Sequence, residues 1–259
     1  MTVSPDNEAL RQVPTRREFW LSICVAALLT FGCGGNSNAL TVFAASSMTD
    51  FLEELLIVEG PPEGSKMPLI NTAGSGTLLL QIDEGANADL VILAGASHME
   101  QLMAGNDFLP ATPFAMTHLS IILSPDLMHS GLSFGDLWSG DLQGAMCVSS
   151  APCGQLAARF GSAKGVNMEG LSREPNVRAV LTKVEHGDVD FGFVYETDFL
   201  SSEAEITEVP GAGAQGFSTT YYLAISKEAK DIAELRTMVN RITGKAGREV
   251  LLKLGFMTP

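Results

Sequence analysis

Basic residues are few in this sequence, and acidic residues outnumber them. The 259 residues include 16 Lys and Arg against 30 Asp and Glu, a formal net charge of −14. The first 40 residues carry equal numbers of both, so the acidic excess belongs to the rest of the chain. No cluster of basic residues with interleaved aromatics offsets it. A surface of this charge repels nucleic acid, and we therefore expect no nucleic-acid partner.

Long apolar runs are also lacking, apart from one near the start of the chain. Residues 20–31 form an apolar run that is too short for a stable membrane span, and a pair of arginines precedes it. This arrangement is typical of a twin-arginine export signal, and its end resembles a lipoprotein cleavage box. We expect an export signal over residues 1–33, a tether over residues 34–39 and lipidation of Cys33, with a plain cleaved signal as the alternative. The mature protein would be periplasmic or otherwise extracytoplasmic and would touch a membrane only through the lipid.

Cysteine is rare, and only Cys147 and Cys153 lie outside the signal region. Five residues separate them, across a turn from a strand into a helix, so the two thiols can meet if the turn folds back. The compartment of an exported protein is oxidising. We expect a disulfide between Cys147 and Cys153, and two free buried thiols are the alternative.

The sequence signatures of the common enzyme classes are missing. No metal-ligand cluster, Walker loop or dinucleotide fingerprint is present. Gly74-Ser75-Gly76 is shorter than the nucleophile elbow of serine hydrolases, and none of the four histidines belongs to a motif with a paired acid. We therefore expect no enzymatic activity and no cofactor, with a serine hydrolase as the alternative.

Strand and helix patterns alternate from residue 40 to the C-terminus. The strand candidates are residues 40–44, 68–72, 90–93, 119–123, 145–149, 191–195 and 219–225. The helix candidates are residues 49–58, 77–84, 98–104, 154–160, 177–186 and 231–254. This alternation predicts an α/β fold with mainly parallel sheets. Strands near Leu119 and Tyr222 would carry the chain between a lobe 1, residues 40–118 and 218–259, and a lobe 2, residues 119–217.

Small and hydroxylated residues stand where four of these strands lead into helices. The four joints are Ala45-Ser46-Ser47, Gly74-Ser75-Gly76, Pro152-Cys153-Gly154 and Asn176-Val177-Arg178, and a further strand ends on Tyr195. The first turn of a helix leaves N–H groups without acceptors and carries a partial positive charge, which suits an anion. Taken singly, such residues usually only cap a helix. Two joints in each lobe together predict a cleft lined by N–H donors for one shared ligand.

In order and approximate spacing, these motifs resemble those of the periplasmic molybdate-binding proteins of ABC transporters. The resemblance also includes Phe43-Ala44 before the first joint and Val194 before Tyr195, and it extends over nearly all of the mature chain. It implies the two-lobed periplasmic-binding-protein fold of class II, in which each lobe is a mainly parallel sheet flanked by helices and the ligand lies between the lobes. It also implies a monomer that captures molybdate or tungstate and delivers it to the permease subunits of an ABC importer.

The resemblance further assigns the groups that hold the anion. Its oxygens would be bound by the hydroxyls and N–H groups of Ser47 and Ser75, by the N–H groups of Cys153 and Val177, and by the hydroxyl of Tyr195, with no direct ligand to the metal. Cys153 stands where many relatives have alanine, a change that a backbone contact tolerates. A binding protein of the same fold for another oxyanion, such as sulfate, is the alternative.

Overall fold

Strands and helices alternate through the part of the chain that the computed structural model describes, residues 39–63 and 65–259. The expected export signal, the lipidation of Cys33 and the tether up to residue 38 lie outside this part. Among the described residues, no helix has the length and apolarity needed to cross a membrane. The names lobe 1 and lobe 2 are kept for the two regions defined above.

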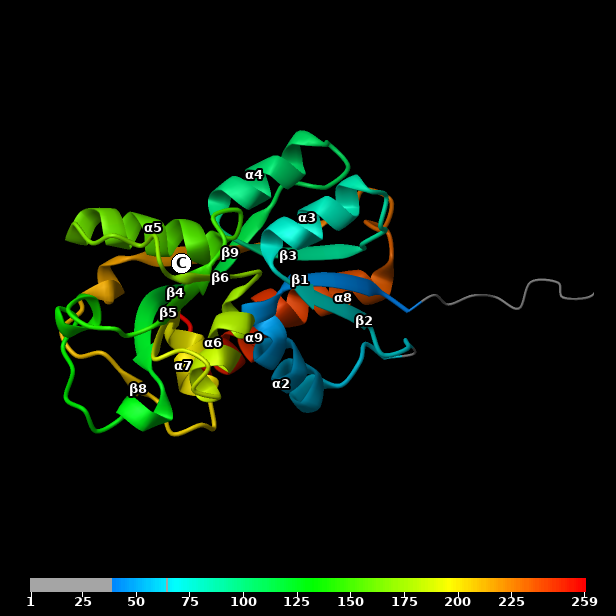
Figure 1. Ribbon diagram of the computed structural model, residues 1–259. Helices are drawn as coiled ribbons and strands as arrows, with labels where there is room; N and C mark the ends of the chain where they lie inside the picture. Colours follow the sequence, from blue (N-terminus) through cyan, green and yellow to red (C-terminus); the bar gives the residue numbers. More distant parts are fainter. Residues whose placement is uncertain (1–38, 64) are drawn as a thin grey trace, which may run out of the picture. The chain divides into compact units, whose positions relative to one another are not determined.

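Lobe 1 is built on three parallel strands. Strand β1 (Thr41–Ala45) pairs in parallel with β2 (Leu69–Ala73) and with β3 (Leu90–Ala94). Its helical segments are η1 (Ser46–Met48), α2 (Thr49–Glu59), α3 (Ser75–Asp83), α4 (Ala96–Ala104), α8 (Ala233–Thr243) and α9 (Lys245–Lys253). Helices α3 and α4 cover one face of the strands, and α2, α8 and α9 cover the other (Figure 1).

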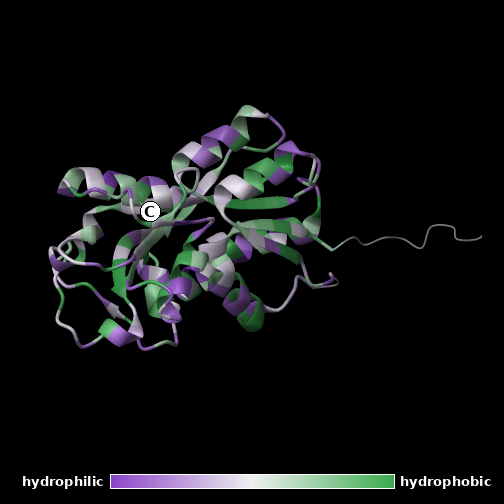
Figure 2. Cartoon of the chain, viewed as in Figure 1, coloured by the Kyte–Doolittle hydropathy of each residue, from purple (hydrophilic) through white to green (hydrophobic). Residues whose placement is uncertain are grey.

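Alternate residues of the strands enter two separate cores. All five residues of β3 are buried. Leu90 and Ile92 pack in the cluster that holds α2, α8 and α9, whereas Val91 and Leu93 pack in the cluster that holds α3 and α4. Successive side chains of a strand point to opposite faces, so an unbroken apolar run predicts a strand that is covered on both sides. Figure 2 shows the resulting pattern, with hydrophobic central strands and hydrophilic outer helix turns.

Lobe 2 repeats the plan of three parallel strands. Strand β5 (Gly144–Cys147) pairs in parallel with β6 (Ser172–Glu174) and with β7 (Phe191–Tyr195). The other segments are η2 (Pro125–Leu127), η3 (Asp136–Trp138), α5 (Pro152–Lys164), α6 (Val177–Glu185), α7 (Glu196–Ser201), β8 (Thr207–Glu208) and η4 (Ala214–Gly216). Its buried apolar residues form a third cluster of their own.

Two long strands join the lobes. Strand β4 (Thr112–Leu123) pairs antiparallel first with β9 (Ser218–Ile225) and then, from Leu119, with β7. Strand β9 also pairs antiparallel with β3. The strand order is therefore β2-β1-β3-β9-β4-β7-β5-β6, with β8 beside β4. The predicted α/β class, with parallel strands and flanking helices in each lobe, is confirmed.

Three predicted elements are wrong in extent, one of them α5, which runs from Pro152 to Lys164 instead of over residues 154–160. The expected helix over residues 231–254 is two helices, because Gly244 has extended backbone angles, φ −84° and ψ −162°, which end α8 and begin α9. Strand β4 begins at Thr112 rather than at residue 119. Its first half contains polar residues and a proline, but pairing with β9 holds it in the sheet.

Candidate functional site

The structure brings the five predicted ligand residues to one small cavity. Its lining includes Ser47 and Ser75 from lobe 1 and Cys153, Val177 and Tyr195 from lobe 2. All five are buried, with at most 4% of the residue exposed. The rest of the wall consists of small or neutral residues, namely Ala45, Ser46, Ala73, Gly74, Ala94, Ala151, Pro152 and Asn176.

Four of the five residues lie at helix starts. Ser47 lies in η1, directly before α2, and Ser75 is the first residue of α3. Cys153 is the second residue of α5, and Val177 is the first residue of α6. Each of these helices follows a strand of one of the two parallel groups, and the carboxyl ends of parallel strands meet at one edge of a sheet. The topology therefore gathers free N–H groups around the cavity.

The two serine hydroxyls are set up as donors. The Tyr221 hydroxyl donates to Ser47 Oγ at 2.8 Å, and the Ala94 N–H donates to Ser75 Oγ at 3.1 Å. A serine hydroxyl has one proton, and each oxygen here already accepts a bond from its neighbour. Burial raises the pKa of Tyr221 well above its ordinary value, so that phenol keeps its proton. Each serine proton is thus free to be donated to a ligand.

The Tyr195 hydroxyl has no hydrogen-bond partner among the described residues, although it is buried. Burial raises the pKa of Tyr195, and the nearby carboxylate of Asp198 raises it further. The Thr219 hydroxyl opposes this rise in pKa without forming a hydrogen bond with Tyr195. An unpaired buried hydroxyl costs roughly 1–3 kcal/mol. A ligand oxygen that accepts this proton would remove that cost.

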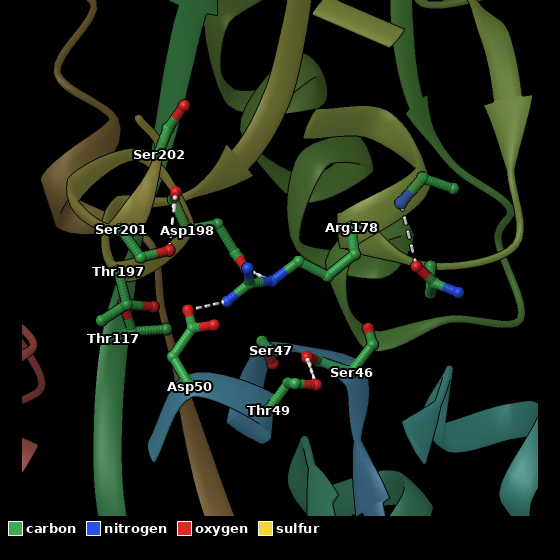
Figure 3. Close-up of polar contacts among 12 residues, drawn as sticks. Ser46, Ser47, Thr49, Asp50, Thr117, Arg178, Thr197, Asp198, Ser201 and Ser202 are labelled. Carbon is green, nitrogen blue, oxygen red and sulfur yellow. Dashed lines mark hydrogen bonds and ion pairs between the residues drawn. The ribbon is translucent and has the colours of Figure 1, made fainter. Parts of the chain in front are cut away.

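A cluster of charges lies beside the cavity (Figure 3). The Arg178 guanidinium forms ion pairs with Asp50 of α2 and with Asp198 of α7. The distance from Arg178 Nε to Asp198 Oδ1 is 2.6 Å, although the N–H is not aligned well enough for a hydrogen bond. Burial raises the pKa of Asp198 to about 6, and the Arg178 cation limits this rise. Among residues 39–63 and 65–259, no charged residue belongs to the cavity lining itself.

A disulfide closes the loop before α5. The Sγ atoms of Cys147 and Cys153 are 1.99 Å apart, and their Cα atoms are 5.7 Å apart. The next residue must be small, because a Cβ atom on Gly154 would lie 2.0 Å from the Val148 carbonyl oxygen. The bridge and the glycine together press the start of α5 onto the end of β5, and so fix the Cys153 N–H.

The backbones of the two lobes approach closely around the cavity. A Cβ atom on Gly74 would lie 2.7 Å from the Pro175 carbonyl oxygen, and one on Gly76 would lie 2.8 Å from the Ser150 carbonyl oxygen. His98 Nε2 lies 2.8 Å from the same Ser150 oxygen. The cavity is therefore closed by direct contact between lobe 1 and lobe 2.

Sequence reasoning missed the residues that support the donors. Tyr221 lies 174 residues from Ser47 along the chain, and Asp50 lies 128 residues from Arg178. Nothing local in the sequence indicates either contact. The available signals were Asp50 and Asp198, acidic residues in the first turns of the helices that follow Ser47 and Tyr195.

The chain is similar to known solute-binding proteins in sequence and in fold. A family model described as bacterial extracellular solute-binding protein matches residues 40–257. The molybdate-binding protein ModA of Mycobacterium tuberculosis (strain ATCC 25618 / H37Rv) is 31% identical, over 91% of this chain and 96% of that protein. Solved structures share the fold as well, and two of them serve as examples. The periplasmic molybdate-binding protein of Azotobacter vinelandii has a TM-score of 0.71 at 19% identity, over 85% of this chain and 99% of that chain. The sulfate-binding protein SubI of Mycobacterium tuberculosis H37Rv has a TM-score of 0.71 at 11% identity, over 85% of this chain and 87% of that chain.

Proposed function

This chain belongs to the family of bacterial extracellular solute-binding proteins, and from that premise we propose that it captures molybdate or tungstate and delivers the anion to an ABC importer. The observation that carries the proposal is the set of unused donors in the cavity. Three hydroxyls, of Ser47, Ser75 and Tyr195, have protons free for a ligand, and four helix starts add N–H groups.

A fully deprotonated tetrahedral oxyanion matches this set. Such an ion offers only acceptors, and in the described part of the chain the cavity lining contains no carboxylate that could accept a proton from it. A dianion buried without partners is very unfavourable. Hydrogen bonds from neutral donors to a charged oxygen contribute roughly 1.5–3 kcal/mol each. Several such bonds offset much of the lost hydration.

The similar proteins support molybdate over sulfate as the bound oxyanion. The protein that is 31% identical to this chain is named for molybdate binding, whereas the sulfate-binding neighbour shares only 11% of its residues. Sulfate is the second candidate, because that neighbour has the same fold. Sulfate is a smaller ion than molybdate or tungstate, so the width of the closed cavity would discriminate between them.

A serine hydrolase receives no support from the cavity. Its lining, among the described residues, contains no histidine that could activate Ser47 or Ser75. Ser75 Oγ accepts a backbone N–H instead of donating to a base. The site is built to hold an anion through its oxygens, and no direct ligand to the metal is needed.

Isothermal titration tests the proposal. We expect heat on adding molybdate or tungstate, with affinity at least roughly a hundredfold higher than for sulfate or phosphate. Preferential binding of sulfate would replace the proposal by its second candidate. Absence of heat with all four anions would overturn both.

We further propose that the protein works outside the cytoplasm as a monomer, with Cys33 carrying a lipid and with permease subunits as partners. The family supports the extracytoplasmic location. Mass spectrometry of the mature N-terminus tests the lipid, since a lipidated Cys33 would be the first residue and would carry the added mass.

A further inference from the structure

A charged triad, Asp50, Arg178 and Asp198, connects the two lobes next to the cavity (Figure 3). Arg178 and Asp198 belong to lobe 2, and Asp50 belongs to α2 of lobe 1. Of the six ion pairs between described residues, only the pair of Arg178 and Asp50 joins one lobe to the other. Among the described residues, the triad thus contains the ion pair that joins lobe 1 to lobe 2.

Every member of the triad is close in sequence to a proposed ligand of the anion. Asp50 comes three residues after Ser47, and Arg178 comes directly after Val177. Asp198 comes three residues after Tyr195. An ion pair between Asp50 and Arg178 therefore fixes the start of α2 relative to the start of α6, and these are the segments that present donors from opposite lobes.

The members of the triad differ in burial. Asp198 is fully buried, whereas the side chains of Arg178 and Asp50 are 27% and 33% exposed. A buried carboxylate needs its cation, so Asp198 holds the guanidinium in place from within lobe 2. The planar guanidinium can contact two carboxylates at once. Because Arg178 is already ordered, its contact with Asp50 loses less side-chain entropy when the lobes meet.

We propose that Arg178, held by Asp198, forms a clamp with Asp50 that positions the donors of the two lobes and keeps the cavity closed on the bound anion. The proposal rests on the proposed function, because it assigns the clamp to that same site. None of the three residues lines the cavity, and their side chains act through the helix starts that they join. They are positioning residues, and their effect is on how long the anion stays bound.

The variant Asp50→Asn tests the clamp, because it removes the charge in lobe 1 and leaves the shape. Release is followed as exchange of isotopically labelled molybdate against excess unlabelled molybdate. We expect the dissociation rate to rise roughly two- to fivefold, the upper part of the range for a partly exposed ion pair. The association rate should change by less than about twofold, because the clamp forms after the anion enters.

Glu54→Gln is the matched control. Glu54 lies on the same helix, and its ion pair with Lys253 of α9, at 2.5 Å, stays within lobe 1. Its dissociation rate should equal that of the unmodified protein. An equal rise in both variants would overturn the proposal, because the effect would then come from the stability of α2.

Arg178→Lys provides a second variant if Asp50→Asn fails to fold. Lysine keeps the charge but is a point charge without the planar fork, so it cannot hold both carboxylates in the same way. We expect Arg178→Lys, too, to release molybdate faster than the unmodified protein does. If the unmodified protein does not bind molybdate, the proposed function fails. If it binds and both variants release the anion at the unmodified rate, the clamp alone is wrong.

Discussion

At the scale of single residues, the cavity is defined by the direction of its hydrogen bonds. The neighbours of Ser47 and Ser75 use the serine oxygens as acceptors, and Tyr195 keeps a hydroxyl that nothing among the described residues accepts. Side chains arranged in this way still have their protons to donate. We therefore expect the preference for an ion without protons to follow from contacts that exist before any ligand binds.

Tyr195→Phe should weaken molybdate binding by about 1.5–3 kcal/mol, or roughly ten- to a hundredfold, because a donor to a charged oxygen is lost. The free energy of unfolding without anion should not fall, since this hydroxyl has no protein partner to lose. Titration calorimetry and urea unfolding measure the two effects.

Ser75→Ala should weaken binding by a similar amount but should also cost about 1 kcal/mol of stability, because the Ala94 N–H loses its acceptor.

Val177→Ala is the matched control, since it keeps the N–H, and it should change affinity by less than roughly tenfold. Cys153→Ala also keeps its N–H, but it breaks the disulfide. Normal binding by Tyr195→Phe together with no binding by Val177→Ala would mean that other atoms hold the anion.

Asp198 predicts a dependence of stability on pH. Its pKa is about 6 in the folded protein against an ordinary value of 3.8, so the folded state binds the proton more tightly. Protonation of Asp198 therefore favours the folded state most strongly below pH 3.8. This contribution to the free energy of unfolding, about 3 kcal/mol at most, is lost as the pH rises towards and through 6. Measured by urea unfolding, the stability of the unmodified protein relative to Asp198→Asn should fall between pH 4 and pH 7. A difference that stays constant with pH would contradict this account.

At the scale of helices and strands, the sequence predicted the features that depend on neighbouring residues in the chain, namely strand ends and helix starts. The small residues at the ends of β1, β2 and β5 and the Asn176 cap of α6 were enough to place four donors at one cavity, because parallel strands bring these ends together. The division of the last helix could not be predicted, because a glycine within a helical pattern is often tolerated and the break at Gly244 depends on packing. The contacts of Tyr221 and Asp50 were also out of reach, since they join distant segments.

The disulfide between Cys147 and Cys153 remains a prediction for the exported protein. It would hold the loop from β5 to α5 and keep the Cys153 N–H in the cavity wall. Alkylation without reductant, followed by mass spectrometry, should leave both cysteines unmodified. Two alkylated thiols would show that the loop is held without a bridge.

Gly74→Ala should act on the contact between lobes rather than on folding. Gly74 has φ −61° and ψ 141°, which any residue adopts, so alanine should change the unfolding free energy by less than about 1 kcal/mol. Its Cβ atom would nevertheless lie 2.7 Å from the Pro175 carbonyl oxygen in the other lobe. Molybdate affinity should fall by more than roughly tenfold, as measured by calorimetry. Gly140→Ala is the control, since a Cβ atom there meets nothing within 4 Å, and an equal loss in both would refute the steric explanation.

At the scale of the whole molecule, the proposed donors belong to two regions that β4 and β9 connect, and lobe 1 packs around two hydrophobic clusters and lobe 2 around one. Lobe 1 supplies Ser47 and Ser75, and lobe 2 supplies Cys153, Val177 and Tyr195. An anion enclosed by both sets can enter only if the lobes separate. Binding should therefore be coupled to closure, which is the expected behaviour of two domains that close around a ligand.

Small-angle X-ray scattering measures this closure directly. The radius of gyration should decrease when molybdate is added, because the ion supplies acceptors that satisfy donors on both lobes and so favours the closed state. Gly74→Ala should contract less than the unmodified protein at saturating molybdate, since its added methyl group holds the lobes apart. Asp50→Asn should contract fully at saturation, because excess molybdate keeps the lobes closed even when each closure is shorter-lived. Identical scattering with and without saturating anion, in a protein shown by calorimetry to bind it, would mean that the site is preformed and that the lobes do not move.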